Sequence, residues 1–143
     1  MIKRYSTDDM SRIWSDYNKF NTWKKVELAV VEVMAEKGII PEESSKIIHN
    51  KADFNVDRVL EIEKTTRHDV IAFLTNMAEF IGPDSRFVHM GMTSSDLLDT
   101  SLALQCKEAG EVILTKLVKF KNVLKNNALK YKDTFQIGRS HGI

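Results

Sequence analysis

The chain of 143 residues is long enough for one globular domain or for a part of a larger one. Apolar residues make up 43% of it, enough for a sizeable core, and a formal net charge of +1 gives no general reason to expect a nucleic acid or a membrane surface as a partner. A single cysteine excludes a disulfide framework, no apolar run approaches the roughly 18 residues of a membrane span, and no basic and apolar leader opens the chain, so a cytoplasmic protein is expected.

The first part of the chain is predicted to hold two helices. Residues 1–6 look extended, and the sequence Ser6-Thr7-Asp8-Asp9 is typical of the N-terminal cap of a short helix. A longer helix is predicted from about residue 18 to residue 37, followed by Gly38 just past its end and by Pro41 at the first position of the next helix. Apolar residues spaced by three and four mark the core-facing side of the longer helix: Phe20, Trp23, Val26, Val30, Val33 and Met34.

The middle of the chain is predicted to hold three more helices. A short polar helix covers residues 42–51, and a second, over residues 55–64, is capped by the asparagine at its start. The pair Thr65-Thr66 is predicted to cap a third helix, from about residue 68 to residue 81. The triplet Arg67-His68-Asp69 therefore falls on the first turn of this third helix. An acid there suits the positive end of the helix dipole, whereas an arginine and a histidine do not, which indicates another task for both.

The longest helix is predicted from Ser94 to about Lys130. At 1.5 Å per residue it spans on the order of 55 Å, and the short helices before it cannot cover its apolar side. Comparable helices from the rest of a longer chain, or from partner subunits, are therefore required. The only cysteine, Cys106, lies on that side and is expected to be an inert core thiol. The residues of the stripe follow one another at spacings of four, four and three: Leu98, Leu102, Cys106, Ala109, Ile113, Leu117, Phe120, Leu124 and Ala128.

These elements predict an all-α fold in two parts. Residues 1–92 form a small N-terminal helical domain, and residues 93–143 form the start of a helical-bundle domain, with its first long helix. After Lys132 the helical pattern stops, and residues 134–137 alternate like a short extended segment. The chain then ends in mid-pattern, at residues 138–143, which we interpret as the sign of a piece of a longer protein.

The stretch from Val88 to Asp96 combines a histidine, a glycine and three hydroxyl residues just before the longest helix. Side-chain oxygens at Thr93, Ser94 and Ser95 are typical of a helix N-terminal cap. The same backbone N–H groups, together with the positive end of the helix dipole, can instead hold a carboxylate or a phosphate. Read alone, the stretch is an ordinary cap, and the sequence leaves both interpretations open.

Three of the four histidines, His68, His89 and His141, lie at predicted element boundaries beside small or charged residues. No two of them have the close helical spacing of a metal-binding pair, so a metal site is not expected. Imidazole titrates near neutral pH, and general acid–base chemistry fits better. The neighbouring arginines, Arg67 and Arg139, suit a substrate with several anionic groups. Taken one at a time, each histidine also has a plain structural interpretation.

Four segments of the chain resemble adenylosuccinate lyase, a family of the fumarase/aspartase superfamily. They occur in that family's order and near its spacing, across all 143 residues. The segment that begins at His89 is similar throughout the superfamily, including the lactonizing enzyme of carboxymuconate. The early Arg-Tyr pair and the Thr-Arg-His-Asp run narrow the resemblance from the superfamily to adenylosuccinate lyase. The segments are Arg4-Tyr5, Thr66-Arg67-His68-Asp69-Val70, His89-Met90-Gly91-Met92-Thr93-Ser94-Ser95-Asp96 and Gly138-Arg139-Ser140-His141-Gly142.

The resemblance implies a lyase that eliminates fumarate by general acid–base chemistry, without metal or other cofactor. Its nucleotide substrates are adenylosuccinate, which gives AMP, and succinyl-aminoimidazole-carboxamide ribonucleotide in purine biosynthesis. His141 matches the family's general acid, and His68 matches its helper. The residues implied to bind substrate are Arg4 and Tyr5 at the phosphate, Thr93 and Ser94 at the succinyl carboxylate, and Arg67, His68, Asp69 and His89 in the same pocket.

The resemblance also implies what this chain lacks. The family's base is a serine on a mobile loop far downstream, and each active site is assembled from three subunits of a homotetramer. The chain by itself is therefore expected to be inactive. Two alternatives stay open: another lyase or cycloisomerase of the superfamily that acts on a different succinyl-type substrate, and a non-catalytic helical module for oligomerisation. Neither a nucleic acid nor a membrane is expected as a partner.

Overall fold

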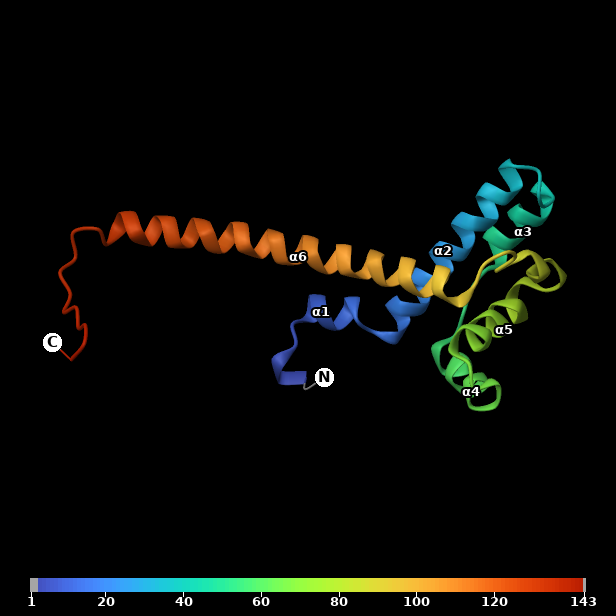
Figure 1. The fold of residues 1–143 in the computed structure, drawn as a ribbon, viewed down its shortest axis with the longest axis horizontal. Helices are drawn as coiled ribbons and strands as arrows, with labels where there is room; N and C mark the ends of the chain where they lie inside the picture. Colours follow the sequence, from blue (N-terminus) through green and yellow to red (C-terminus); the bar gives the residue numbers. More distant parts are fainter. Residues whose placement is uncertain (1–2, 143) are drawn as a thin grey trace. The chain divides into compact units, whose positions relative to one another are not determined.

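The computed structural model describes residues 3–142, and all regular secondary structure in that range is helical (Figure 1). The predicted all-α fold is confirmed. No helix in the described part of the chain has both the length and the apolar character needed to cross a bilayer. The elements are η1 (Lys3–Tyr5), α1 (Asp8–Ile13), α2 (Asp16–Glu36), α3 (Glu42–Lys51), α4 (Val56–Thr66), α5 (Asp69–Ile81), η2 (Pro83–Phe87) and α6 (Ser94–Lys130).

Local capping signals account for most of the helix boundaries. The Asn55 side chain accepts a hydrogen bond from the Arg58 N–H at 2.9 Å and so begins α4 as predicted. Gly38 adopts a φ of 69°, and the Gly38 and Ile39 N–H groups bond back to carbonyls of the last turn of α2. Both α3 and α6 begin and end at the predicted residues, while Pro41 is the N-cap of α3 rather than its first residue.

Two further local predictions, at residues 3–5 and at Thr65-Thr66, were also wrong. Residues 3–5 form a single 3-10 turn where an extended segment was expected, and residues 1–2 lie outside the described range. Thr65 and Thr66 end α4 instead of capping α5, because the chain turns at Arg67 and His68 itself takes the cap position. Arg67 therefore lies between the two helices and not on the first turn of α5.

An aromatic cluster lies at the centre of the hydrophobic core. Phe20 stacks on Phe73 with ring centroids 5.7 Å apart, and Trp23 meets both rings edge to face. Phe20, Trp23 and Phe73 are each at most 2% exposed. Burial of such large rings contributes about 1.5–3 kcal/mol each, which ties α2 to α5.

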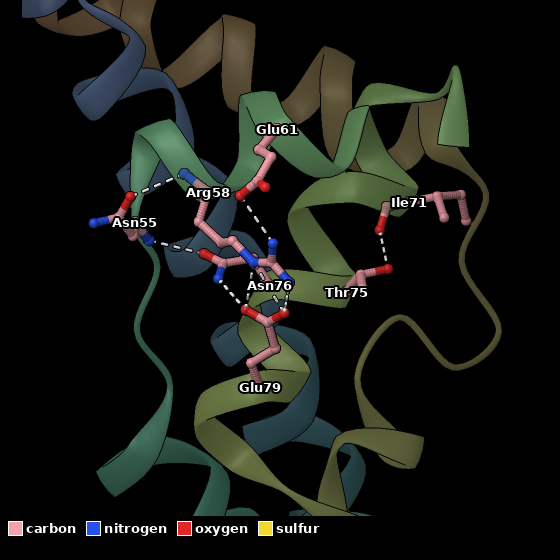
Figure 2. Close-up of polar contacts among 7 residues, drawn as sticks. All are labelled: Asn55, Arg58, Glu61, Ile71, Thr75, Asn76 and Glu79. Atoms are coloured by element: carbon pink, nitrogen blue, oxygen red, sulfur yellow. Dashed lines mark hydrogen bonds and ion pairs between the residues drawn. The ribbon is translucent and has the colours of Figure 1, made fainter. Parts of the chain in front are cut away.

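Polar contacts also fix α4 against α5 (Figure 2). The Asn76 side chain of α5 accepts the Asn55 N–H at 2.8 Å, and its amide donates to Glu79 at 2.9 Å. Glu79 in turn forms an ion pair with Arg58 of α4. These contacts hold the two helices together as a hairpin, and the hairpin places the connecting turn at Arg67 and His68.

The described residues divide into two packing units, with the boundary between Ala109 and Gly110 inside α6. In the first unit, the buried residues of α6 are Leu97, Ser101, Gln105 and Ala109, and of these four only Ala109 belongs to the predicted stripe. The predicted Leu102 is 51% exposed and Cys106 is exposed, so Cys106 is not a core thiol here. The physical reason is that Gln105 donates to the Ile13 carbonyl at 2.8 Å, a polar contact that an apolar pattern does not reveal. The predicted domains, 1–92 and 93–143, stay a prediction.

The second unit carries the rest of α6, whose apolar side chains are exposed from Ile113 onward. Ile113, Leu117 and Phe120 of the predicted stripe are 50–58% exposed. Leu114 and Val118, on a neighbouring side of the helix, are exposed as well, at 63% and 53%. Beyond Lys130 the chain is turn and coil through the described residues, without a strand at 134–137.

Candidate functional site

The connection between α4 and α5 carries three of the predicted site residues. Arg67 adopts a left-handed backbone with a φ of 53°, which glycine takes more readily than any residue with a Cβ atom. His68 is extended, and Asp69 is the first residue of α5. The His68 and Asp69 side chains are 46% and 38% exposed, and Arg67 is also exposed. The turn therefore presents a guanidinium, an imidazole and a carboxylate side by side along the chain.

The His68 ring caps α5. Its Nδ1 accepts the Ile71 N–H at 3.4 Å and lies 3.7 Å from an Asp69 carboxylate oxygen. A ring nitrogen that accepts a hydrogen bond carries no hydrogen, so this cap requires the neutral ring with its hydrogen on Nε2. Protonation of Nδ1 would exchange the cap for an ion pair with Asp69. In the capping state, Nε2–H of His68 is a hydrogen-bond donor.

His89 has a different setting, because a buried carboxylate holds it. Glu27 Oε1 lies 2.6 Å from His89 Nδ1, and Glu27 Oε2 accepts the His89 backbone N–H at 2.9 Å. The Glu27 side chain is fully buried, whereas that of His89 is 17% exposed. Burial raises the pKa of Glu27 above its ordinary value of 4.5, and hydrogen bonds and charge from His89 oppose that rise. Glu27 Oε2 accepts the backbone N–H, and when Glu27 is ionised Nδ1 of His89 is the donor to Oε1.

The start of α6 is capped by an acid more than by hydroxyl groups. The Asp96 carboxylate accepts the Thr93 N–H at 2.8 Å, which is one half of a capping box. The helix begins at Ser94 as predicted. None of the hydrogen bonds described for residues 3–142 uses the Thr93 or Ser94 hydroxyl group. Those hydroxyls are therefore open to a ligand, although Asp96 already places one negative charge on this turn.

Arg4 and Tyr5 form a pair within η1. An Arg4 terminal nitrogen donates to the Tyr5 hydroxyl at 3.0 Å, and the guanidinium lies 4.9 Å from the centre of the Tyr5 ring. Tyr5 is 70% exposed, so the pair offers its polar groups to solvent. His141 belongs to the second packing unit, where it is exposed and has a φ of 49°.

Left-handed backbone is concentrated at the predicted site residues. Within the described range, three residues other than glycine have a positive φ: Arg67, His89 and His141, at 53°, 62° and 49°. Such a conformation costs a residue with a side chain roughly 1–2 kcal/mol relative to glycine. Strained backbone of this kind is typical of functional sites, where a side chain of definite chemistry is required at a position that glycine would fill more easily.

The structure brings some of the predicted residues together and leaves others apart. Contacts join His68 to Asp69 and Arg4 to Tyr5. No hydrogen bond or ion pair described for residues 3–142 joins these two pairs to each other, to His89 or to the start of α6. Asp69 also lines an open cleft of about 350 Å³, together with Trp14, Asp16, Lys19, Trp23, Leu98, Asp99, Leu102 and Gln105. In the same range, no cluster of three or more His, Cys, Asp or Glu side chains could hold a metal ion.

Comparison with known proteins identifies the family. A family model described as Lyase matches residues 3–143. The chain belongs to this lyase family. A crystal structure of fumarate lyase from Mesorhizobium sp. BNC1 superimposes on 97% of this lyase chain with a TM-score of 0.89. Since the two sequences are 21% identical and the match covers 34% of that structure, this likeness concerns the fold alone.

Curated relatives of the lyase chain carry a more specific name. Proteins called adenylosuccinate lyase from Bacillus subtilis (strain 168), Synechocystis sp. and Helicobacter pylori are 43%, 48% and 44% identical to it over all 143 residues. The matched part is 32–33% of each relative. The lyase chain therefore spans about a third of the length of the curated relatives it matches.

Sequence reasoning missed Glu27, the residue that holds His89 in the lyase chain. Glu27 lies four residues after Trp23 and four before Val31, both of which are buried. One signal was present, because an acid at that spacing falls on the core side of an amphipathic helix and requires a partner. The identity of the partner was not readable, since His89 lies 62 residues further along the chain.

Proposed function

We propose that the chain is the N-terminal part of an adenylosuccinate lyase, which eliminates fumarate from adenylosuccinate to give AMP. The same enzyme would act on succinyl-aminoimidazole-carboxamide ribonucleotide in purine biosynthesis. One observation carries the proposal: relatives of that name are 43–48% identical to the chain over its whole length. Motif residues at Arg4, Arg67, His89 and His141 support it, because three of these four have the strained backbone typical of functional positions.

The elimination needs a base, an acid and groups that stabilise negative charge. A base removes the weakly acidic proton beside a carboxylate, and an acid protonates the nitrogen when the C–N bond breaks. We assign the acid to His141, with His68 as its helper. The capping state of His68, with a hydrogen on Nε2, suits a residue that donates to a substrate or to a second histidine. The base would come from a downstream serine.

Substrate binding is assigned to the exposed groups of the first unit. The helix N-terminus at Ser94 and the free Thr93 and Ser94 hydroxyls suit the succinyl carboxylate. The guanidinium of Arg4 and the hydroxyl of Tyr5 suit the nucleotide phosphate. Further substrate contacts are assigned to Arg67, His68, Asp69 and His89. No cofactor takes part in this scheme, and a cytoplasmic location agrees with the metabolic role.

The complete enzyme is proposed to be a homotetramer. From Ile113 onward the large apolar side chains of α6 are half exposed or more in this chain, and a helix of this kind is normally covered by other long helices. In the assembled enzyme, partner subunits and the remainder of the chain would supply that cover. They would also complete an active site to which this chain contributes one part.

The test is a substrate panel on the protein expressed from the complete open reading frame. Fumarate release and AMP formation are followed with adenylosuccinate, fumarate release with argininosuccinate, and lactone formation with carboxymuconate. Turnover of adenylosuccinate at least a hundredfold above the other two is expected. Preference for either of the other substrates would move the protein elsewhere in the superfamily. Absence of turnover on all three, with an intact tetramer, would favour a non-catalytic helical module.

A further inference from the structure

Glu27 occupies a position in α2 that an apolar residue would fill at lower cost. It lies on the buried side of the helix and is fully buried, as are its neighbours one turn away, Trp23 and Val31. Taking a carboxylate out of water costs several kcal/mol unless its oxygens are hydrogen-bonded in return. The contacts that Glu27 makes are therefore the reason to look for a role beyond packing.

Both Glu27 oxygens bond to a single residue, His89. Oε1 meets the ring at Nδ1, 2.6 Å away, and Oε2 meets the backbone N–H, 2.9 Å away. The distance to the ring is short, as expected for a bond to an ionised acceptor. One side chain thus fixes both the backbone and the ring of a residue 62 positions away in sequence.

The loop around His89 is anchored by its alternate residues. Val88, Met90 and Met92 are partly buried and pack against the hydrophobic core. The Met92 N–H bonds to the His89 carbonyl at 3.3 Å, which closes a turn. Between these anchors, His89 has the left-handed φ of 62° that glycine would adopt more easily. Glu27 compensates that strain through the backbone N–H.

We propose that Glu27 is the positioning residue of His89: it keeps a hydrogen on Nδ1 and thereby makes Nε2 the nitrogen that exchanges its proton and meets the substrate. An ionised carboxylate only accepts hydrogen bonds, so Nδ1 must donate in both the neutral ring and the imidazolium. The His89 side chain is 17% exposed, so part of it is within reach of a ligand.

The neutral rings of His68 and His89 thereby carry their hydrogens on different nitrogen atoms. Nδ1 of His68 accepts a backbone N–H, so its neutral ring carries the hydrogen on Nε2. Nδ1 of His89 donates to Glu27, so its neutral ring carries the hydrogen on Nδ1. A neutral His68 is a donor at Nε2, and a neutral His89 is an acceptor there. Only the assignment of a substrate to Nε2 of His89 rests on the proposed function.

The first test reads the ring directly in this chain, without any activity. Nitrogen-15 NMR of the imidazole, with His89 assigned by its loss in His89→Gln, identifies the nitrogen that carries the hydrogen in the neutral ring. Nδ1 is expected in the wild-type chain. In Glu27→Gln, whose amide has one acceptor and one donor, the hydrogen is expected to move to Nε2. The exposed Glu32→Gln on the same helix is the matched control and keeps the wild-type tautomer.

A neutral wild-type ring with its hydrogen on Nε2 would overturn the proposal, and this result needs no variant to fold. The second test uses the complete protein with adenylosuccinate. Glu27→Gln is expected to raise KM about tenfold or more with a smaller change in kcat, since it disturbs a binding group, while Glu32→Gln matches the wild type. An unchanged KM and kcat in a folded Glu27→Gln would remove the positioning role. Inactivity of the wild type would refute the proposed function but leave the NMR result to decide the tautomer.

Discussion

Arg58 of α4 donates hydrogen bonds to Glu79 of α5 through two of its nitrogen atoms. Nε lies 3.1 Å and 3.3 Å from the two carboxylate oxygens, and a terminal nitrogen lies 2.7 Å from one of them (Figure 2). The third nitrogen donates to Glu61 at 2.9 Å. The contact of Arg58 with Glu79 joins the two helices of the hairpin that presents Arg67 and His68, and Asn76 of α5 also donates to Glu79.

This network predicts how stability changes in acid. Hydrogen bonds from Arg58, and then from Asn76, hold the pKa of Glu79 below its ordinary 4.5. A carboxyl group whose pKa is lowered by folding contributes stability above its unfolded pKa and loses that contribution as the pH falls through the folded value. Glu79→Gln is therefore expected to be less stable than the wild type at pH 7, with the difference shrinking below about pH 4.5. Urea unfolding of both proteins at a series of pH values measures this difference in the free energy of unfolding.

The control for this experiment is Glu36→Gln, an exposed acid near the end of α2. Its stability should follow the wild-type curve at every pH. A Glu79→Gln variant that differs from the wild type equally at pH 7 and pH 3.5 would show that the loss is one of packing and not of charge.

Arg67→Gly is expected to raise stability while lowering activity. Arg67 has a left-handed backbone, so glycine relieves strain, and a gain of up to about 1 kcal/mol in the free energy of unfolding is expected. Arg67→Ala keeps the strain and should be close to neutral. In the complete protein, both variants lose the charged hydrogen bond that we propose Arg67 makes with the substrate, worth about 1.5–3 kcal/mol, so kcat/KM for adenylosuccinate should fall about tenfold or more. Full activity in a stabilised Arg67→Gly would exclude Arg67 from substrate binding.

The helix boundaries were predictable because their causes are local. Asn55 and Gly38 act on backbone groups within a few residues, and the bounds of α3 and α6 follow from their own sequences. The connection between α4 and α5 was misread for a related reason. Two threonines and a histidine are all acceptable caps, and only the packing of the two helices decides that His68 takes that position.

The contacts between distant segments were not predictable from periodicity. An apolar pattern does not show that the polar residues Gln105 and Asn18 are buried. Both are buried because their side-chain amides donate to the backbone carbonyl of Ile13. Glu27 was overlooked for the same reason. Likewise, strain at Arg67 and His89 is a property of the folded backbone, so the sequence could mark these residues only by their place at predicted helix boundaries and by their resemblance to a family.

Asn18 and Gln105 are expected to be coupled through their shared acceptor. The Ile13 carbonyl accepts from the Asn18 amide at 2.9 Å and from the Gln105 amide at 2.8 Å. Removing either donor leaves the carbonyl one bond, so Asn18→Ala and Gln105→Ala should each cost about 1 kcal/mol. The double variant leaves a buried carbonyl bare and should cost about 1–3 kcal/mol more than the sum. Strict additivity in urea unfolding would show that the two bonds are independent.

His141→Ala is expected to lower kcat of the complete protein by about two decades, the usual contribution of a general acid. His49→Ala, at an exposed position of α3, is the matched control and should keep wild-type turnover. Circular dichroism and sedimentation establish that both variants keep the fold and the assembly. Near-normal turnover in His141→Ala would remove His141 from the acid role and leave His68 as the candidate.

Self-association through α6 is expected already for this chain. Leu117 and Leu124 are 54% and 52% exposed and line an apolar hollow on the helix beyond Gly110. Replacing both with lysine puts charges where another helix would pack, and the association constant should fall at least tenfold, since about 1.4 kcal/mol suffices for that change. Sedimentation velocity over a concentration series measures it, with Lys119→Ala/Lys125→Ala as the control for altered charge. A wild-type chain that stays monomeric at high concentration would show that α6 requires the downstream helices before it can pair.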